Sequence, residues 1–184
     1  MLDCRALGAL LLGGVLTGCA GRQRLAPARP ACPAARVSTH GWPLVTDSAG
    51  VSYRLPAAFA ERATGAAFRE WLLEGDFQQS IAVGFMPSSS PASSLGRTAS
   101  PGMLEMTQCV DSVGSREVLV QAWRTRGGVF RDGRHRDRYD VFAVVPVRAD
   151  LRLYLASGGY ERRTQELALA VVRTIAVAAG SPPN

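Results

Sequence analysis

The side chains best suited to chemistry in this sequence are two histidines and the carboxylates close to one of them. His135 lies near Asp137 and Asp140, and imidazole and carboxylate groups at such spacings are possible metal ligands. Four arginines between positions 131 and 138 interleave with these residues, and their positive charges would repel a cation. We therefore interpret this run as a solvated hairpin tip with local ion pairs and predict no metal site. His40 is interpreted as a loop residue.

Other catalytic patterns are missing from the sequence. No Gly-x-Ser-x-Gly elbow occurs, and the lack of lysine excludes Ser-x-x-Lys nucleophiles. The sequence has no phosphate loop, no Gly-x-Gly-x-x-Gly fingerprint and no Cys-x-x-Cys pair. Two carboxylates could still converge in space for sugar hydrolysis. We predict a non-catalytic protein without a cofactor, and keep two alternatives: a small hydrolase and a carrier of a small apolar ligand.

Arginines concentrate around the same hairpin tip. Guanidinium groups bind carboxylates and phosphates through paired hydrogen bonds, so this cluster is a candidate surface for an anionic headgroup or an acidic protein. All 21 basic residues are arginine and the net charge is +6. A bias toward G and C codons explains this charge, and we do not predict nucleic-acid binding. The candidate recognition residues are Arg124, Arg126, Arg131, Arg134, Arg136 and Arg138.

The N-terminus carries chemistry of another kind. Arg5 precedes an apolar stretch from Ala6 to Val15, which at about ten residues suits a signal peptide, whereas a spanning helix needs ~20. The sequence Leu16-Thr17-Gly18-Cys19 follows. It resembles the lipobox of bacterial lipoproteins, in which a peptidase cuts before the cysteine and the cysteine is acylated. The resemblance implies a signal peptide over residues 1–18 and lipidation of Cys19.

The same resemblance implies a location. Acyl chains on Cys19 would anchor the chain on the periplasmic side of the bacterial envelope, because each buried methylene contributes ~0.8 kcal/mol. Residue 20 is Ala rather than Asp, which favours the outer membrane over the inner one in lipoproteins of the enterobacterial type. We expect a membrane-anchored periplasmic lipoprotein of binding or assembly type. Its expected partner is an envelope protein or an anionic headgroup, and either alternative function would operate in the envelope.

The remaining cysteines favour a disulfide bond. Cys4 leaves with the leader and lipidation consumes Cys19, which leaves Cys32 and Cys109 as a pair in an oxidising compartment. We predict a bond between them that fixes the N-terminal segment to the folded domain. The alternative is a buried thiol at Cys109 and a free thiol at Cys32.

Composition divides the mature chain into three parts. Residues 19–40 are rich in Pro, Ala and Arg and cannot bury a core, which predicts a disordered tether after the acylated cysteine. Such a tether would reach ~60 Å at ~3.1 Å per residue. Residues 41–178 are predicted to form a single α+β domain, and residues 179–184 a disordered tail. Within the domain, Pro87 to Gly102 is predicted to be a long, disordered loop.

Alternation of apolar and polar residues predicts antiparallel strands joined by hairpins. A short helix is expected within residues 57–67. Helical spacing of apolar residues predicts a second helix from Glu161 to about Thr174, with acidic residues toward its start as the macrodipole favours. Trp71 and Trp123 are interpreted as core residues. Strands are predicted over residues 42–46, 51–55, 68–74, 77–86, 104–113, 116–126, 139–147 and 151–157.

The order of these elements is similar to Mog1/PsbP-like domains. The likeness rests on Tyr53-Arg54-Leu55-Pro56 followed by Phe59, and on Leu151 to Ala156 followed by a helical stretch from Thr164 to Ile175. It covers about residues 42–178 and implies an antiparallel sheet packed with a C-terminal helix in an α/β/α sandwich. It also implies a binding or assembly role, although a fold by itself does not give a function.

Overall fold

We describe the fold from a computed structural model of the chain. The described residues are 30–34, 36–62, 68–73, 76–89, 102–127 and 133–178, with the backbone alone for residues 76–78. The predicted signal peptide, Cys19, the first part of the tether, Arg131, the centre of the predicted long loop and the C-terminal tail lie outside these residues. Within the described part of the chain, no helix is long and apolar enough to cross a membrane.

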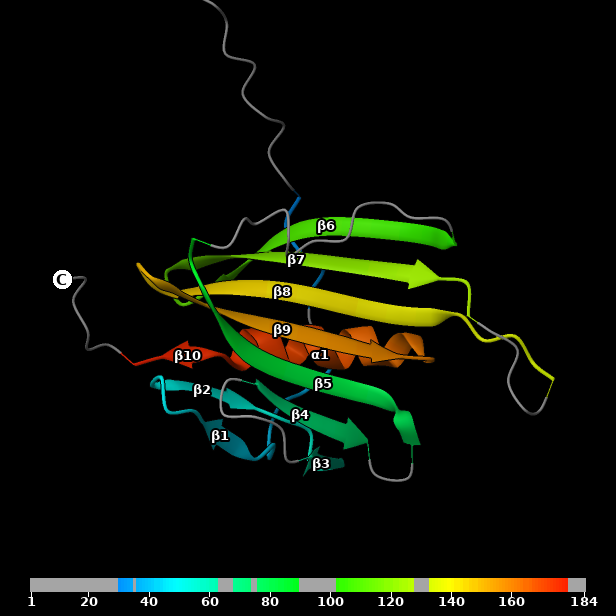
Figure 1. The fold of residues 1–184 in the computed structure, drawn as a ribbon, viewed down its shortest axis with the longest axis horizontal. Coiled ribbons are helices and arrows are strands. Elements are labelled where there is room, and N and C mark those ends of the chain that lie inside the picture. The colour runs from blue at the N-terminus through cyan, green and yellow to red at the C-terminus, as the bar shows by residue number, and fades with distance from the viewer. Residues whose placement is uncertain are drawn as a thin grey trace, which may run out of the picture.

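Seven antiparallel strands form the main sheet, in the order β3-β4-β5-β9-β8-β7-β6 (Figure 1). The chain passes from β5 in the middle of the sheet to β6 at its far edge. It then returns through β7, β8 and β9, and β9 pairs with β5. The strands are β3 (Phe59–Arg62), β4 (Phe68–Leu73), β5 (Asp76–Pro87), β6 (Met103–Val113), β7 (Arg116–Thr125), β8 (Arg138–Arg148) and β9 (Leu151–Gly159).

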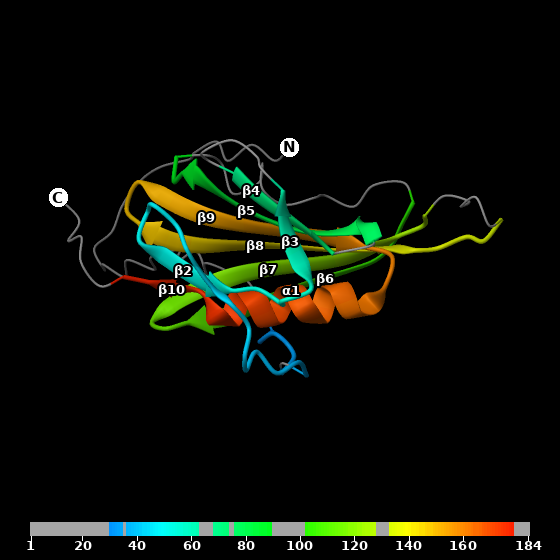
Figure 2. The same ribbon diagram turned by 90° about the horizontal axis from the view of Figure 1, so that it is seen from below.

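One helix, α1 (Arg162–Thr174), packs across one face of this sheet (Figure 2). Successive strand residues point to opposite faces, so one alternate set of side chains meets the helix. On that inner face Ile81, Leu153 and Leu155 have no exposed surface, and neither do Val171 and Val172 of the helix. Each such side chain contributes about 1.5–3 kcal/mol on burial. The domain is therefore α+β, as predicted, with its core between the sheet and α1.

A smaller sheet closes one end of the core. It has the order β1-β2-β10, with β1 (Leu44–Thr46), β2 (Val51–Arg54) and β10 (Ala176–Val177). Val51 and Tyr53 of β2 are fully buried, and the Tyr53 ring meets the edge of Trp71 at 5.7 Å between centroids. Burial raises the pKa of the Tyr53 hydroxyl above its usual range. This end of the molecule therefore joins the start of the domain to the residues that follow the helix.

The N-terminal segment, residues 30–34 and 36–42, crosses the outside of α1 and begins at the edge of β6. Ala31 forms a parallel bridge with Val110, supported by hydrogen bonds from Cys32 N to Val110 O and from Val110 N to Pro30 O, both 2.9 Å. A disulfide joins Cys32 to Cys109, as predicted. Arg173 of α1 donates to the Pro33 carbonyl oxygen and to Asp111 of β6. The end of the segment predicted as a tether is thus attached to the domain.

Two local predictions are corrected, and one short strand was not predicted. Part of the helix expected within residues 57–67 is strand β3, because its four consecutive residues pair in register with β4. The helix α1 begins at Arg162, so Glu161 is its N-cap residue and the first turn contains no acidic side chain. The sequence also gave no signal for β10, whose two residues pair with β2 only because the helix returns the chain there. The strands expected elsewhere are present, with ends shifted by a few residues.

Candidate functional site

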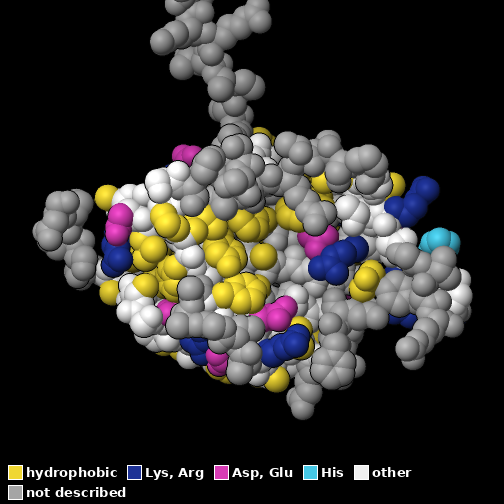
Figure 3. Space-filling model, in the orientation of Figure 1, with side chains coloured by type: hydrophobic (Ala, Val, Ile, Leu, Met, Phe, Trp, Pro, Cys, Tyr) yellow, Lys and Arg dark blue, Asp and Glu magenta, His cyan; other side chains and the backbone are white. Residues whose placement is uncertain are grey.

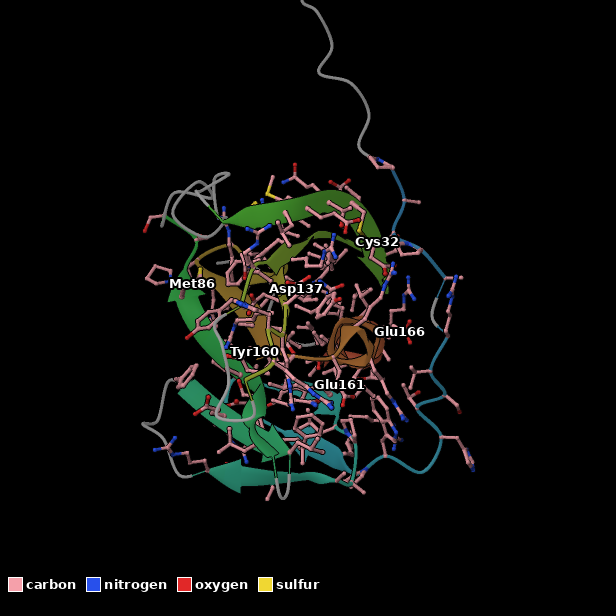
Figure 4. All side chains as sticks on the ribbon, turned by 90° about the vertical axis from the view of Figure 1, so that its right-hand side faces the viewer. Cys32, Met86, Asp137, Tyr160, Glu161 and Glu166 are labelled. Carbon is pink, nitrogen blue, oxygen red and sulfur yellow. A yellow bond between two sulfur atoms is a disulfide. The ribbon has the colours of Figure 1, made fainter. Side chains whose placement is uncertain are left out.

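A groove lies on the helix side of the molecule, between the start of α1, strands β6 and β7, and the N-terminal segment. Its cavity volume is about 520 Å³. Figure 4 views this end of the molecule and shows Glu166 pointing away from the sheet, toward the N-terminal segment. Apolar atoms of Val120, Ala122 and Leu169 alternate with polar groups in the lining. The polar lining includes Arg36, Glu105, Arg124, Tyr139, Gln165 and Glu166.

The charge of Arg124 in this groove is already balanced. Its Nε lies 3.5 Å from Glu105 Oε2 and its Nη1 lies 3.3 Å from Asp137 Oδ2. The Arg124 side chain is 37% exposed, so these ion pairs are weak contributors to stability. An anionic ligand in the groove would have to compete with two carboxylates, which disfavours strong anion binding at Arg124.

Gln165 holds the beginning of α1 against the sheet. Its Nε2 donates to the carbonyl oxygens of Trp123, at 3.0 Å, and Asp140, at 3.2 Å. Beside it, the Thr164 hydroxyl donates to Oε1 of Gln79 at 3.1 Å, and both residues are buried. These bonds fix the beginning of α1 to the sheet, so we interpret Gln165 as a structural residue of the groove wall and Thr164 as a buried structural residue beside it.

The opposite side of the main sheet carries no helix among the described residues, and we call it the open face. Its centre is apolar, whereas a solvent-facing side of an antiparallel sheet is usually polar. Figure 3 shows hydrophobic side chains gathered over the middle of this face, with charged groups around them. Its apolar side chains include Phe68, Leu72, Ala82, Met86, Leu119, Trp123, Phe142, Val144, Tyr154 and Ala156, and Met106 at the β6 edge.

Three aromatic rings form a row across the open face. The Tyr154 ring lies between Phe68, at 6.3 Å between centroids, and Phe142, at 6.1 Å, with interplanar angles of 22° and 20°. Gly84 permits this arrangement, because a Cβ at that position would overlap the Tyr154 ring. The rings therefore lie side by side over four strands and are partly exposed. Partial burial raises the pKa of the Tyr154 hydroxyl above its ordinary value.

Ion pairs of both signs border the open face. Arg138 Nε lies 2.8 Å from Asp140 Oδ1 over Gly158, and Arg148 Nε lies 2.8 Å from Asp150 Oδ1. A third pair joins Arg62 and Glu70 at 3.9 Å. These three pairs are each neutral, and Arg152 adds a further charged side chain to the open face. An apolar centre with a polar rim is typical of protein interfaces.

The structure separates the predicted recognition arginines. Arg124 points to the helix side, whereas Arg138 points to the open face, and each is paired with carboxylates. Arg126, Arg134 and Arg136 are exposed. Recognition of an anionic partner by these exposed side chains stays a prediction.

Among the described residues, neither histidine lies with side chains that could form a catalytic site with it. His40 and His135 are both exposed. Asp137 and Asp140, the carboxylates near His135, bond Arg124 and Arg138 instead. No group of three His, Cys, Asp or Glu in the described part of the chain is placed to hold a metal ion.

Comparison with known proteins gives no family. No family model and no curated protein matches the chain. Among solved structures, a crystal structure from Bacteroides thetaiotaomicron is similar over 72% of this chain, with 10% identity and a TM-score of 0.42. The chain spans 47% of the length of that protein.

The open face was not predicted, although the sequence contains a signal for it. Residues 141–147 are an unbroken apolar run, and such a run indicates a strand with apolar side chains on both faces. The aromatic row had no such signal. Its three rings come from different strands and are brought together only by the register of the sheet.

Proposed function

We propose that this protein is a lipid-anchored bacterial envelope protein of the non-catalytic binding type, and that another envelope protein docks on its open face. The observation that carries the proposal is the apolar centre of that face with its row of three rings. A contiguous exposed apolar patch on a small domain is typical of an interaction site. Partly exposed aromatic side chains are also the residues that contribute most to protein interfaces.

The charges around the open face favour a protein partner over an anionic lipid surface. Each arginine of the three rim pairs lies within 4 Å of a carboxylate, so the rim offers little net attraction to phosphate groups. A protein can bury the apolar centre and place both charge signs opposite the rim.

The compartment and the anchor are supported by the sequence Leu16-Thr17-Gly18-Cys19, whose acylation would place the domain in the periplasm, with the outer membrane favoured. The disulfide between Cys32 and Cys109 agrees with this proposal, because disulfides persist in oxidising compartments.

The alternatives receive less support. A carrier would need an apolar cavity between sheet and helix, but that space is filled by fully buried side chains such as Val83, Leu155 and Val171.

We also propose, from the closing unit β9–α1, that the domain is a variant of the Mog1/PsbP-like arrangement. It would be a variant because the described residues place a helix layer on one side of the sheet alone.

Photo-crosslinking in the bacterial envelope tests the docking surface. A photoreactive phenylalanine analogue replaces Phe142, on the open face, in the full acylated chain. The matched control carries the analogue at Arg163, which is exposed on α1. We expect a discrete protein adduct from position 142 and none of that mass from position 163. Equal adduct patterns at both positions, or lipid adducts alone from position 142, would contradict a protein partner on this face.

A further inference from the structure

We propose that the β6 edge of the main sheet faces the membrane, with its backbone at the level of the lipid headgroups and the side chains of Leu104 and Met106 reaching the upper acyl chains. The inference rests on the proposed acylation of Cys19. It adds an orientation to that anchor and identifies a second contact with lipid. Three observations carry it: where the chain from Cys19 meets the domain, which apolar side chains are exposed there, and how the edge is built.

The anchoring chain joins the domain at β6. The hydrogen bonds of Val110 with Pro30 and Cys32, together with the disulfide to Cys109, fix the N-terminal segment to this strand. Eleven residues therefore lead from the lipidated Cys19 to Pro30. At ~3.1 Å per residue they reach about 34 Å, roughly half the reach of a tether that ran free to residue 40. The β6 edge is thus the part of the domain that the anchor keeps closest to the bilayer.

Exposed aliphatic side chains lie on the same strand. Leu104 and Met106 are each 42% exposed. Together with Leu44, they are the most exposed large hydrophobic side chains in the described part of the chain. They lie four to six residues along β6 from Val110, which is about 13–20 Å at the rise of a strand. Glu105 between them is paired with Arg124, and the exposed Arg126 is close, since its backbone N–H donates to Gly102 O. Aliphatic groups beside arginine suit the interface of a bilayer.

The backbone of β6 sets the depth of the contact. Val110 directs its N–H and C=O outward, to the N-terminal segment, and alternation along the strand directs those of Gln108 and Met106 outward as well. Unpaired backbone groups are not tolerated in the hydrocarbon core. The edge therefore lies at headgroup level, where water and phosphates satisfy these groups while the two side chains reach the upper acyl chains.

Met106 lies on the open-face side of β6, so this orientation uses the border of the open face and leaves its aromatic centre and the helix groove available. A sheet that stands on its β6 edge presents the open face and the helix groove sideways, parallel to the bilayer surface. Leu44 of β1 is 58% exposed but belongs to the small sheet, away from β6 (Figure 1). It is the matched control, because its exposure is as great while its predicted distance from lipid is larger.

Fluorescence quenching by spin-labelled lipids tests the orientation. Leu104→Cys, Met106→Cys and Leu44→Cys are made in the full chain, acylated in bacteria and labelled with NBD under non-reducing conditions. Mass spectrometry records the acyl chains and the intact Cys32–Cys109 bond, and circular dichroism records the fold. The proteins are reconstituted into phosphatidylethanolamine and phosphatidylglycerol liposomes that carry nitroxides high on the acyl chain or near its end.

We expect quenching at positions 104 and 106 to be several-fold greater than at position 44, and greater with the shallow nitroxide than with the deep one. Equal quenching at the three positions in acylated protein would overturn the orientation and leave the anchor standing. Stronger quenching by the deep nitroxide would overturn the headgroup depth. Protein recovered without acyl chains would overturn the anchor itself, and the orientation with it.

Discussion

At the residue scale, the open face depends on the absence of a Cβ atom at Gly84. Its lack of a Cβ lets Tyr154 lie across β5 between two phenylalanines. No periodicity in the sequence distinguishes this glycine from others in strands. The requirement arises from the pairing of Gly84 with Tyr154 in neighbouring strands.

Gly84→Ala is expected to destabilise the protein. The added methyl group must displace the Tyr154 ring, and overpacking of this kind costs about 1–3 kcal/mol. Urea unfolding followed by circular dichroism measures the change in the free energy of unfolding. In a Tyr154→Ala background the same substitution should cost far less, because the ring is absent. An equal cost in both backgrounds would show that the ring contact is not the cause.

Glu61 on β3 and Arg69 on β4 form the best-aligned surface ion pair, with two contacts of 2.7 Å. The hydrogen bonds from Arg69 lower the pKa of the Glu61 carboxyl below its ordinary 4.5. A lowered folded-state pKa means that this pair stabilises the protein above the ordinary pKa and that the contribution disappears as the pH falls through the folded pKa.

Comparison of wild type with Glu61→Gln tests this dependence. We expect wild type to have the higher melting temperature at neutral pH, by a small margin because Glu61 is 45% exposed. The margin should shrink as the pH is lowered through 4.5 and below. A margin that stays constant over this range would contradict the role assigned to the charge of Glu61.

At the scale of elements, α1 is held by its buried face rather than by favourable ends. Its N-cap residue, Glu161, makes no side-chain cap hydrogen bond, and the first turn carries Arg162 and Arg163. Positive charge at this end opposes the helix macrodipole. The apolar spacing predicted the helix correctly because burial of residues such as Ala168 and Val171 outweighs its poorly capped start.

Glu161→Ser is therefore expected to stabilise the protein by about 0.5–1 kcal/mol, since a serine hydroxyl at an N-cap accepts a hydrogen bond from the first turn. Thermal unfolding measures the gain. Glu161→Ala removes the same carboxylate without supplying a cap, so it should give no such gain. If both variants behave alike, the missing cap is not what limits the helix.

The N-terminal segment is the element whose position depends most on a covalent bond. Cys32 and Cys109 are 77 residues apart in sequence, and a cross-link over such a loop stabilises a domain by about 4 kcal/mol in the chain-entropy model. Cys32→Ala should lower the free energy of unfolding by up to this amount, measured in denaturant. Reductant should then destabilise wild type but not the variant. If reductant destabilises both proteins equally, the Cys32–Cys109 bond is not the source of the stabilisation.

At the scale of the whole molecule, the domain offers two different faces from one sheet. The inner face is closed by α1 and contains the core, while the open face presents apolar side chains within a rim of ion pairs (Figures 2 and 3). The anchoring chain joins at the edge between these faces, at β6. The proposed lipid contact uses Met106 at the β6 border of the open face, whereas the proposed docking surface uses the aromatic row at its centre.

Replacement of Cys19 tests the anchor for the whole protein. Cys19→Ala removes the sulfur that would be acylated, so the protein should move from the membrane fraction to the periplasmic fraction or remain unprocessed. Fractionation and mass spectrometry of the N-terminus measure both outcomes. A substitution at Cys32 is the control, because it removes a thiol but leaves the anchor. A Cys19 variant that is processed and still recovered with the membrane as fully as wild type would contradict lipidation.

The sequence by itself determined the local features of this protein. Alternating apolar residues identified the β5 to β9 strands, since each strand's own pattern reflects the face it buries. Helical spacing identified α1, and the count of cysteines identified the Cys32–Cys109 bond. Each of these conclusions depends only on residues close together in the chain or on composition, and both can be read directly from a sequence.

Only the tertiary structure decided which surfaces exist. Phe68, Phe142 and Tyr154 are far apart in sequence, and the strand order and register bring their rings together. The same order separates Arg124 from Arg138, which are neighbours in one predicted hairpin but belong to opposite faces. The place where the anchoring chain meets the domain was equally undetermined, because a contact between distant segments depends on the whole arrangement of the sheet.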